Sequence, residues 1–251
     1  MQLYGLVGYP LGHSFSKKYF TDKFKREGLA DVLYENFETK DLPGLKIKLG
    51  KEHRLKGLNV TIPYKSSIIP YLDSYDTTVA KLNACNCISI KNEKWIGANT
   101  DVVGFEKSFV KKWQPHQGHA LILGTGGSSK AVEFVLQKLG ISCLLVSREK
   151  TAPNIISYHQ VDRNILEKHT IIINTTPLGM YPNVEGYTPL NYDLVTSKHY
   201  LFDLIYNPEK TLFLKKGEAQ GALIENGYDM LVAQAEESWR IWNEPYNQKV
   251  F

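Results

Sequence analysis

Long hydrophobic runs are missing from this sequence. Apolar stretches such as Ile171-Ile172-Ile173 are far too short to cross a bilayer, which takes about 20 apolar residues. The N-terminal stretch MQLYGLVGYP lacks both the basic start and the apolar core of a secretory signal. We therefore expect a cytoplasmic protein with no membrane partner.

Cysteine is also scarce. Cys85, Cys87 and Cys143 are the only three, so they cannot all pair with one another, and a disulfide scaffold is not expected. Cys85 and Cys87 stand two apart, as in some metal sites, but no further run of metal ligands follows them. Small buried thiols on one face of a strand are the favoured interpretation, and no metal site is expected.

Blocks of like charge are missing as well. Lys and Arg total 30 against 26 Asp and Glu, and the net charge of +4 is spread along the chain. This distribution does not favour a nucleic-acid-binding arm but is compatible with a small anionic ligand. A monomer and a homodimer both remain open, because exposed apolar surface cannot be assigned from the pattern.

A β-α-β unit is the strongest local pattern that the sequence does contain. Residues 120–123 form an apolar run of strand length, and glycines follow at once. Apolar residues then recur at helical spacing until Gly140, which predicts the end of a helix, and residues 141–146 supply a second strand. The glycine turn therefore lies between a strand and a helix, as in dinucleotide-binding domains.

The turn itself reads Gly124-Thr125-Gly126-Gly127-Ser128-Ser129, with serine at the third position of the glycine fingerprint. Small residues let the backbone approach a pyrophosphate, whose charge would meet free amides at the positive end of the helix. An ordinary tight turn is the alternative interpretation.

The end of the second predicted strand indicates which dinucleotide is bound. NAD enzymes usually place a carboxylate there for the ribose hydroxyl, whereas this chain has Ser147 and Arg148, with Lys150 just beyond. A guanidinium can pair with a 2′-phosphate, so NADP is favoured over NAD. Two alternatives stay open: Glu149 could reach the ribose if Arg148 points into solvent, or Arg148 and Lys150 could be a solvated loop.

The remaining pattern predicts two α/β domains. Strands at 170–174, 200–204 and 222–225, with a helix over 211–220, extend the first unit into a doubly wound parallel sheet. Before residue 101 we predict strands at 3–8, 32–37, 57–61 and 87–91 and helices at 16–27 and 42–49. We assign residues 1–103 to a substrate-binding and catalytic domain, 104–228 to a Rossmann-like NADP-binding domain, and about 229–251 to a helix that packs back onto the first domain.

Three polar clusters follow predicted strands of the first domain: residues 12–16, residues 59–61 with Lys65, and residues 83–86 with 99–101. Hydroxyls, amides, one ammonium and one carboxylate are the groups that would orient a polyhydroxylated acid. Each cluster alone could serve as caps and turns, and Ser14 or Ser16 is also a natural cap for the first helix.

Seven phrases of the sequence, taken together, resemble the shikimate dehydrogenase family: GYPLGHSFS, GLNVTIPYK, ANTDVVGF, ILGTGGSSKA, NTTPLGM, DLIYNP and NGYDMLVAQAEESW. They occur in the family's order and approximate spacing and span almost the whole chain. The resemblance implies NADPH-dependent, reversible reduction of 3-dehydroshikimate to shikimate, in chorismate and aromatic amino acid biosynthesis. It also implies a substrate domain that faces a Rossmann domain across a cleft.

The resemblance further implies a role for individual residues. Lys65 and Asp101 match the catalytic acid-base pair. The substrate-binding residues would be Ser14, Ser16, Asn59, Thr61, Asn86, Tyr206 and Gln234, with the two serines on the carboxylate. The cofactor-binding residues would be Gly124, Gly126, Gly127, Ser128, Ser147, Arg148, Thr175, Gly227 and Met230.

The chain departs from the family pattern in three places. The family's serine loop usually continues with Pro and then His-Asn, whereas Lys17 follows Ser16 here and Tyr19-Phe20 stands further on, which could change the helix start. The adenosine motif usually begins Asn-Arg-Thr but reads Ser147-Arg148-Glu149 in this chain. The second departure bears on the degree of NADP preference. The third lies at Asn83-Ala84-Cys85-Asn86-Cys87, where the family commonly has Gly-Ala-x-Asn-Thr, and the asparagine is kept.

The chemistry of a ketone reduction explains why a lysine would be needed. When hydride reaches the carbonyl carbon, negative charge builds on the oxygen, and an ammonium within hydrogen-bond reach can polarise the carbonyl and deliver the proton. Two other functions remain open: a quinate/shikimate dehydrogenase of broader specificity, and a non-catalytic sensor that binds shikimate and NADP. Retention of both Lys65 and Asp101 argues against the sensor.

Overall fold

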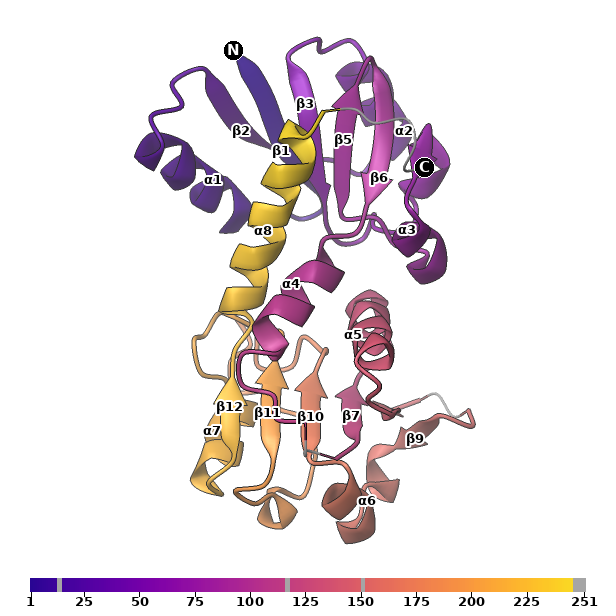
Figure 1. The fold of residues 1–251 in the computed structure, drawn as a ribbon, viewed down its shortest axis with the longest axis vertical. Coiled ribbons are helices and arrows are strands. Elements are labelled where there is room, and N and C mark those ends of the chain that lie inside the picture. Colours follow the sequence, from indigo (N-terminus) through magenta and orange to yellow (C-terminus); the bar gives the residue numbers. More distant parts are fainter. Residues whose placement is uncertain (13–14, 116–117, 150–151, 246–251) are drawn as a thin grey trace. The chain divides into compact units, whose positions relative to one another are not determined.

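The computed structural model describes residues 1–12, 15–115, 118–149 and 152–245 (Figure 1). The chain divides into two compact units, Met1–Thr100 with Ala235–Phe251 as unit 1 and Asp101–Gln234 as unit 2. The sequence had placed the boundaries after residues 103 and 228. Ser14, Lys150 and residues 246–251 of the predicted C-terminal helix lie outside the described residues.

Unit 1 is built on a mixed six-stranded sheet with the order β2-β1-β3-β5-β6-β4. Its strands are β1 (Gln2–Gly8), β2 (Val32–Glu38), β3 (Leu55–Val60), β4 (Ser74–Tyr75), β5 (Cys87–Lys91) and β6 (Lys94–Ala98). β1 runs parallel to both β2 and β3, whereas β5 is antiparallel to β3 and to β6. The loops that follow β1 and β3 therefore leave the sheet at the same edge, as the predicted polar clusters require.

The two faces of this sheet carry separate hydrophobic cores. The helical elements of unit 1 are α1 (Phe15–Arg26), α2 (Leu42–Leu49), η1 (Ile69–Tyr71), α3 (Thr77–Leu82) and the C-terminal part of α8 (Tyr228–Asn243). One core takes side chains from α2 and α3, and the other takes them from α1 and α8. In the second core, Trp242 packs against Tyr4 and Phe20 and donates its indole N–H to the Ile88 carbonyl at 3.0 Å. A Cβ on Gly57 would lie 2.3 Å from the Trp242 ring, so only glycine lets the helix approach β3 this closely.

The two neighbouring cysteines lie in different cores, and the prediction that they share one face is wrong. Cys85 precedes β5 and packs in the core that α2 covers, whereas Cys87 begins β5 and packs in the core that α8 covers. The Cys85 thiol donates instead to the Cys87 carbonyl at 3.3 Å. Burial raises the pKa of both thiols. No group of three or more His, Cys, Asp or Glu side chains suited to a metal ion occurs among the described residues.

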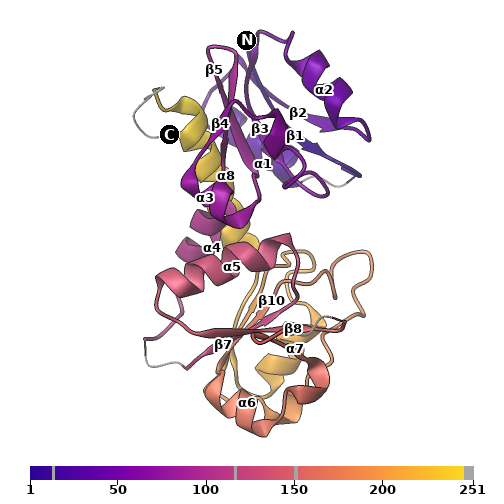
Figure 2. The same ribbon diagram turned by 90° about the vertical axis from the view of Figure 1, so that its right-hand side faces the viewer.

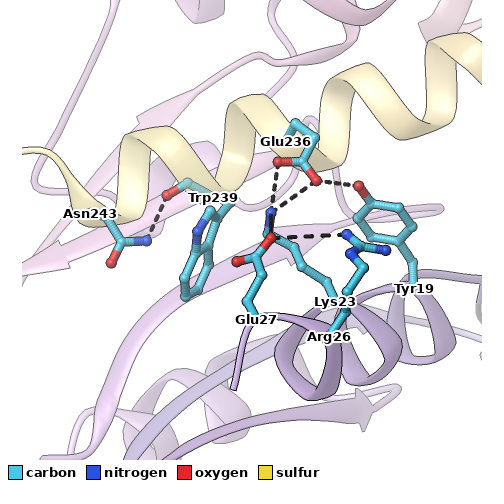
Figure 3. Close-up of polar contacts among 7 residues, drawn as sticks. All are labelled: Tyr19, Lys23, Arg26, Glu27, Glu236, Trp239 and Asn243. Atoms are coloured by element: carbon cyan, nitrogen blue, oxygen red, sulfur yellow. Dashed lines mark hydrogen bonds and ion pairs between the residues drawn. The ribbon is translucent and has the colours of Figure 1, made fainter. Parts of the chain in front are cut away.

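An ion-pair cluster joins α1 to α8 within unit 1 (Figure 3). Lys23 on α1 is almost fully buried, and its Nζ lies 2.8 Å from Glu27 Oε1 and 2.8 Å from Glu236 Oε2. Tyr19, one turn before Lys23, donates its hydroxyl to the same Glu236 carboxylate. The Lys23 ammonium also lies 5.9 Å from the centre of the Trp239 ring. Glu236 on α8 thus pairs with the second and third turns of α1.

Unit 2 is a six-stranded parallel sheet with the order β12-β11-β10-β7-β8-β9, which confirms the predicted doubly wound class (Figures 1 and 2). The strands are β7 (Ala120–Leu123), β8 (Cys143–Ser147), β9 (Ile155–Ser157), β10 (Ile171–Asn174), β11 (Tyr200–Asp203) and β12 (Leu223–Glu225). Central strands β7, β10 and β11 are buried throughout, as expected of parallel strands that helices cover on both faces.

Helices lie on both faces of the unit 2 sheet, with α4 and α5 on one face and α6 and α7 on the other (Figure 2). The helical elements are α4 (Asp101–Phe109), α5 (Gly127–Lys138), η2 (Tyr158–Gln160), α6 (Arg163–Lys168), η3 (Tyr192–Leu194), α7 (Leu212–Ala219) and the first part of α8. Across the ranges that the structure describes, every helix is too short or too polar to cross a membrane.

Candidate active site

Lys65 lies in the turn that follows β3 in unit 1. The turn is fixed by the main chain, because the Tyr64 amide donates to the Thr61 carbonyl at 2.9 Å and the Cys85 amide donates to the Lys65 carbonyl at 2.7 Å. The Tyr64 hydroxyl adds a bond of 2.7 Å to the Thr39 carbonyl. The Lys65 side chain is partly buried, on a backbone held at both ends of the turn.

Asn59, on β3, has its side-chain amide held from two sides. Its Oδ1 accepts a hydrogen bond of 2.8 Å from the Tyr34 hydroxyl on β2. Its Nδ2 donates to Ser238 Oγ on α8 at 2.9 Å and to the Asn86 carbonyl at 3.4 Å. Tyr34 and Ser238 are both buried, and the sequence had assigned neither to the site.

Asn86 is buried just before β5 and is held by the backbone and side chain of Thr100. The Thr100 amide donates to Asn86 Oδ1 at 2.6 Å, and Asn86 Nδ2 donates to Thr100 Oγ1 at 3.1 Å. Thr100 Oγ1 in turn lies 3.3 Å from Ser238 Oγ. The two predicted asparagines therefore share one polar network, with Ser238 between them.

Ser16 joins the same network from the first turn of α1. Its side chain hydrogen-bonds with the Tyr34 hydroxyl, and burial raises the pKa of that phenol well above its usual value. Thr61, the next predicted contact, follows β3 and donates its amide to the Val7 carbonyl at 2.9 Å. Ser14 lies outside the described residues, and α1 begins directly after it, at Phe15.

The structure thus brings three predicted side chains of unit 1 together, Ser16, Asn59 and Asn86, and adds Tyr34 and Ser238. One signal in the sequence pointed to Ser238. It follows Ala235 by three residues and precedes Trp242 by four, so this serine stands on the apolar stripe of the last helix. A hydroxyl on such a stripe needs a hydrogen-bond partner once it is buried.

Asp101 is the first residue of α4 and is 5% exposed, at the start of unit 2. Its carboxylate stands in the first helical turn, where negative charge is favoured by the helix dipole. The pairing of Asp101 with Lys65, which belongs to unit 1, stays a prediction.

The glycine turn between β7 and α5 has the geometry of an anion-binding site. Gly124 adopts φ +111°, a conformation that favours glycine. A Cβ on Gly126 or Gly127 would meet nothing within 4 Å, so the backbone here is open to a ligand. Gly126 caps α5 without any side-chain bond, which leaves the amides of the first turn facing outward. These residues therefore fit a pyrophosphate, and Ser128 lies in the same turn, partly buried.

Serine at the third fingerprint position has a structural reason. Ser129 is 1% exposed, and its hydroxyl donates to the Gly126 carbonyl at 2.6 Å. The side chain therefore folds back onto the turn, away from the open backbone of Gly126 and Gly127.

The two residues predicted to bind the adenosine phosphate, Ser147 and Arg148, are adjacent at the end of β8 but differ in exposure. Ser147 is buried, and its Oγ accepts from the Glu149 amide at 3.3 Å, whereas Arg148 is exposed. Arg148 acts electrostatically on Tyr158: burial raises the pKa of that phenol to about 12, and the guanidinium opposes the rise.

Asp203, at the end of β11, is a buried carboxylate that the sequence analysis did not assign. It accepts from Asn174 Nδ2 at 3.0 Å, from the Ile205 amide at 3.0 Å and from Thr211 Oγ1 at 2.6 Å. Burial raises the pKa of Asp203 to about 7, against the lowering effect of these bonds. Asp203 therefore ties together the loops after β10 and β11 and the start of α7.

The residues predicted nearer the nicotinamide lie at these same strand ends of unit 2. Thr175 follows β10 and donates both its amide and its hydroxyl to the Leu123 carbonyl, at 2.9 and 2.8 Å. Gly227 packs so closely that a Cβ would lie 2.1 Å from the Leu204 carbonyl oxygen. Tyr206 and Gln234 are partly buried and Met230 is buried; burial also raises the pKa of Tyr206.

Comparison with known proteins identifies the family. Residues 6–88 match the model of the shikimate dehydrogenase substrate binding domain. Two curated relatives, both named shikimate dehydrogenase (NADP(+)), are similar over nearly the whole chain. The one from Methanosphaera stadtmanae is 36% identical, with 95% of this chain and 90% of the relative covered, and the one from Clostridium beijerinckii is 38% identical, with 97% and 93% covered.

A solved structure agrees with the sequence relatives. Shikimate dehydrogenase 1 from Peptoclostridium difficile superposes with a TM-score of 0.84 at 35% identity, covering 100% of this chain and 95% of the other. The resemblance inferred from the seven phrases is thereby confirmed. The chain belongs to the shikimate dehydrogenase family.

Proposed function

We propose that the protein catalyses the reversible, NADPH-dependent reduction of 3-dehydroshikimate to shikimate, a step of chorismate and aromatic amino acid biosynthesis. The observation that carries this proposal is similarity to NADP(+)-dependent shikimate dehydrogenases over nearly the whole chain. The expected compartment, the cytoplasm, and the expected assembly, a monomer or homodimer, remain predictions.

Each unit has its own part in the proposed reaction. Unit 1 binds the substrate, which is supported by the match of residues 6–88 to a substrate binding domain. Unit 2 binds NADP, which is supported by the open glycine turn at the start of α5 and by Arg148 at the end of β8.

Substrate recognition rests on hydroxyl and amide groups. Ser14 and Ser16 bind the carboxylate, Asn59, Thr61, Asn86, Asp101 and Gln234 bind the ring hydroxyls, and Tyr206 reaches the same pocket. Support comes from the network through Ser16, Tyr34 and Asn59, which fixes these polar groups in orientation before any ligand arrives.

Lys65 acts as the acid in the reduction and as the base in the reverse direction. Its ammonium donates a proton to the ketone oxygen as negative charge develops there, and Asp101 orients the ammonium and holds a neighbouring hydroxyl. The turn between Thr61 and Cys85 supports this role, because its main-chain bonds fix the backbone that carries Lys65.

The bound NADPH supplies the hydride, and the residues of unit 2 hold and orient it. Gly124, Gly126, Gly127 and Ser128 take the pyrophosphate, Ser147 and Arg148 take the adenosine phosphate, and Thr175, Gly227 and Met230 line the nicotinamide side. Support for the pyrophosphate site comes from Gly126 and Gly127, where a Cβ would meet nothing within 4 Å and the backbone is open to a ligand.

The proposal is tested by initial rates of NADP⁺ and NAD⁺ reduction, with shikimate and then quinate as the reductant. Fast NADPH formation with shikimate alone is the expected result. Comparable rates with quinate or NAD⁺ would place the protein among dehydrogenases of broader specificity. Binding of NADP(H) and shikimate without turnover would contradict the enzyme assignment in favour of a sensor.

A further inference from the structure

The Asn59 amide has a defined orientation in unit 1. The Asn86 main-chain carbonyl can only accept a hydrogen bond, so the side-chain atom that faces it, 3.4 Å away, must be the donor Nδ2. The other amide atom is then Oδ1, which accepts from the Tyr34 hydroxyl. Both hydrogens of Nδ2 are thus directed to protein acceptors, Ser238 Oγ and the Asn86 carbonyl.

The oxygen of the same amide keeps an accepting position. A carbonyl oxygen has two lone pairs, and within the described part of the chain Oδ1 accepts only the bond from Tyr34. The Asn59 side chain is partly exposed, so a ligand can reach it. Toward a ligand, Asn59 is therefore an acceptor.

Ser238, which is remote from Asn59 in the sequence, favours this orientation by accepting a hydrogen bond directly from Nδ2. Its Oγ is fully buried on α8, 179 residues after Asn59 in the sequence, and takes the hydrogen bond from Nδ2 at 2.9 Å. The same oxygen lies 3.3 Å from Thr100 Oγ1, which holds the Asn86 amide. One hydroxyl from the last helix thus supports two side chains on which the proposed function relies.

We propose that Ser238 is a positioning residue that, with Tyr34, locks the Asn59 amide so that its oxygen accepts a hydrogen bond from a ring hydroxyl of the substrate. This inference rests on the proposed function and deepens it. The lock discriminates by chemistry: a hydroxyl can donate to Oδ1, whereas a carbonyl oxygen at that position would place two acceptors against each other. The reacting ketone must therefore lie away from Asn59.

The first test compares Ser238→Ala with a matched control, Ser108→Ala. Ser108 is also a fully buried helical serine, but its Oγ has no hydrogen-bond partner among the described residues. We expect Ser238→Ala to raise the KM for shikimate roughly tenfold, with a smaller change in kcat and no change in the KM for NADP⁺. Ser108→Ala should leave all three values at the wild-type level.

The second test asks whether Ser238 acts through Asn59. In an Asn59→Ala background, Ser238→Ala should raise the KM for shikimate far less than it does in the wild-type background, because only its contact with Thr100, which holds Asn86, is left to lose. Tyr34→Phe, which removes the other bond to the amide, should behave in the same way. Additive effects of both substitutions would overturn the inference, because a residue that only stabilises the fold would weaken binding independently of Asn59.

Equilibrium binding of shikimate, measured by calorimetry, separates this inference from the proposed function. If the wild-type protein binds shikimate without oxidising it, the proposed reaction fails, and the same double-mutant cycle is read from Kd in place of KM. If the protein neither binds nor oxidises shikimate, both proposals are wrong. Equal KM and Kd values in Ser238→Ala and wild type would overturn the positioning role alone.

Discussion

Lys23 and Glu236 are separated by 213 residues in the sequence, and their charged groups lie 2.8 Å apart in unit 1 (Figure 3). The Lys23 side chain is only 6% exposed, whereas the Glu236 side chain is 41% exposed. This asymmetry matters because the buried ammonium retains its desolvation cost when it loses one of its two carboxylate partners.

Replacing Glu236 by Gln should therefore destabilise the protein. We expect a loss of about 1–3 kcal/mol in the free energy of unfolding, measured by urea denaturation. Glu218→Gln is the matched control, because its pair with Lys210 has the same 2.8 Å separation but both side chains are at least 42% exposed. The control should change stability by less than about 0.5 kcal/mol. Equal losses in the two variants would contradict this account.

The Lys23–Glu236 ion pair should also make the free energy of unfolding depend on pH, in both the acid and the alkaline range. Burial alone would raise the pKa of Glu236, but the bonds from Lys23 and Tyr19 outweigh it, and the pKa lies below 4.5. Burial alone would lower the pKa of Lys23, but the bonds to Glu236 and Glu27 hold it above 10.5. The contribution of this ion pair to folding stability is therefore complete between pH 4.5 and pH 10.5, the ordinary pKa values of the two groups.

The stability difference between wild type and Glu236→Gln should follow that window. It should shrink as the pH falls through the lowered pKa of Glu236, and again as the pH rises through the raised pKa of Lys23. Urea denaturation at a series of pH values measures it. A difference that stays constant from neutral pH down to pH 2.5 would show that the carboxylate is not the stabilising group.

Asp203 should make the free energy of unfolding fall as the pH rises through the acid range, whereas the Lys23–Glu236 pair makes it rise. Burial raises its pKa in the folded protein to about 7, from the usual 3.8, so the folded state holds the proton more tightly than the unfolded chain does. The resulting contribution is complete below about pH 4 and is lost as the pH rises toward about 7. Asp203→Asn should remove this slope from the curve of unfolding free energy against pH. The exposed Asp193→Asn should retain it, and a retained slope in Asp203→Asn would assign it to another group.

Lys65→Ala tests the acid-base role directly. We expect kcat to fall by a factor of about 10²–10⁴, because the proton and the charge stabilisation are lost together, while the KM for shikimate changes much less. The exposed Lys51→Ala should have wild-type kinetics. Equal turnover in wild type and Lys65→Ala would remove the lysine from the mechanism.

Two glycine-to-alanine substitutions should have contrasting effects. Gly57→Ala places a methyl group 2.3 Å from the Trp242 ring, so we expect a loss of about 1–3 kcal/mol in stability. Gly126→Ala adds a methyl group in open space, so the fold should be kept. The KM for NADP⁺ should nevertheless rise in Gly126→Ala, because the pyrophosphate would approach this backbone. Thermal unfolding and steady-state kinetics on both variants check the contrast.

The sequence predicted the elements that bury continuous apolar runs. The strands at 120–123 and 200–204 are recognisable because parallel strands covered on both faces carry few polar residues. It missed α4, whose stretch DVVGFEKSF contains two valines and a glycine that weaken helical propensity. It also missed β4, which has only two residues and depends on pairing with β6.

The site was predicted from motifs, which explains what was missed. Asn59 stands in the phrase GLNVTIPYK and Asn86 in one of the predicted polar clusters, whereas Tyr34 stands in no family phrase and Ser238, although it lies within NGYDMLVAQAEESW, was given no role. Their role depends on hydrogen bonds to Asn59 between segments far apart in the chain, and periodicity, which marks Ser238 as buried, does not name its partner. Asp203 is similar: the sequence shows a carboxylate near the end of a predicted strand, but only the packing shows that it holds three neighbouring groups.

The passage of α8 into unit 1 has a consequence for protein synthesis. Unit 2 is one continuous segment and can complete its contacts as soon as residue 234 has left the ribosome. Most of unit 1 is synthesised first, but its core cannot be completed until α8 is made, because Trp242 covers the face of β3 at Gly57. Until then the first hundred residues expose an unfinished core on the nascent chain, so the first domain to be made is the last to be completed.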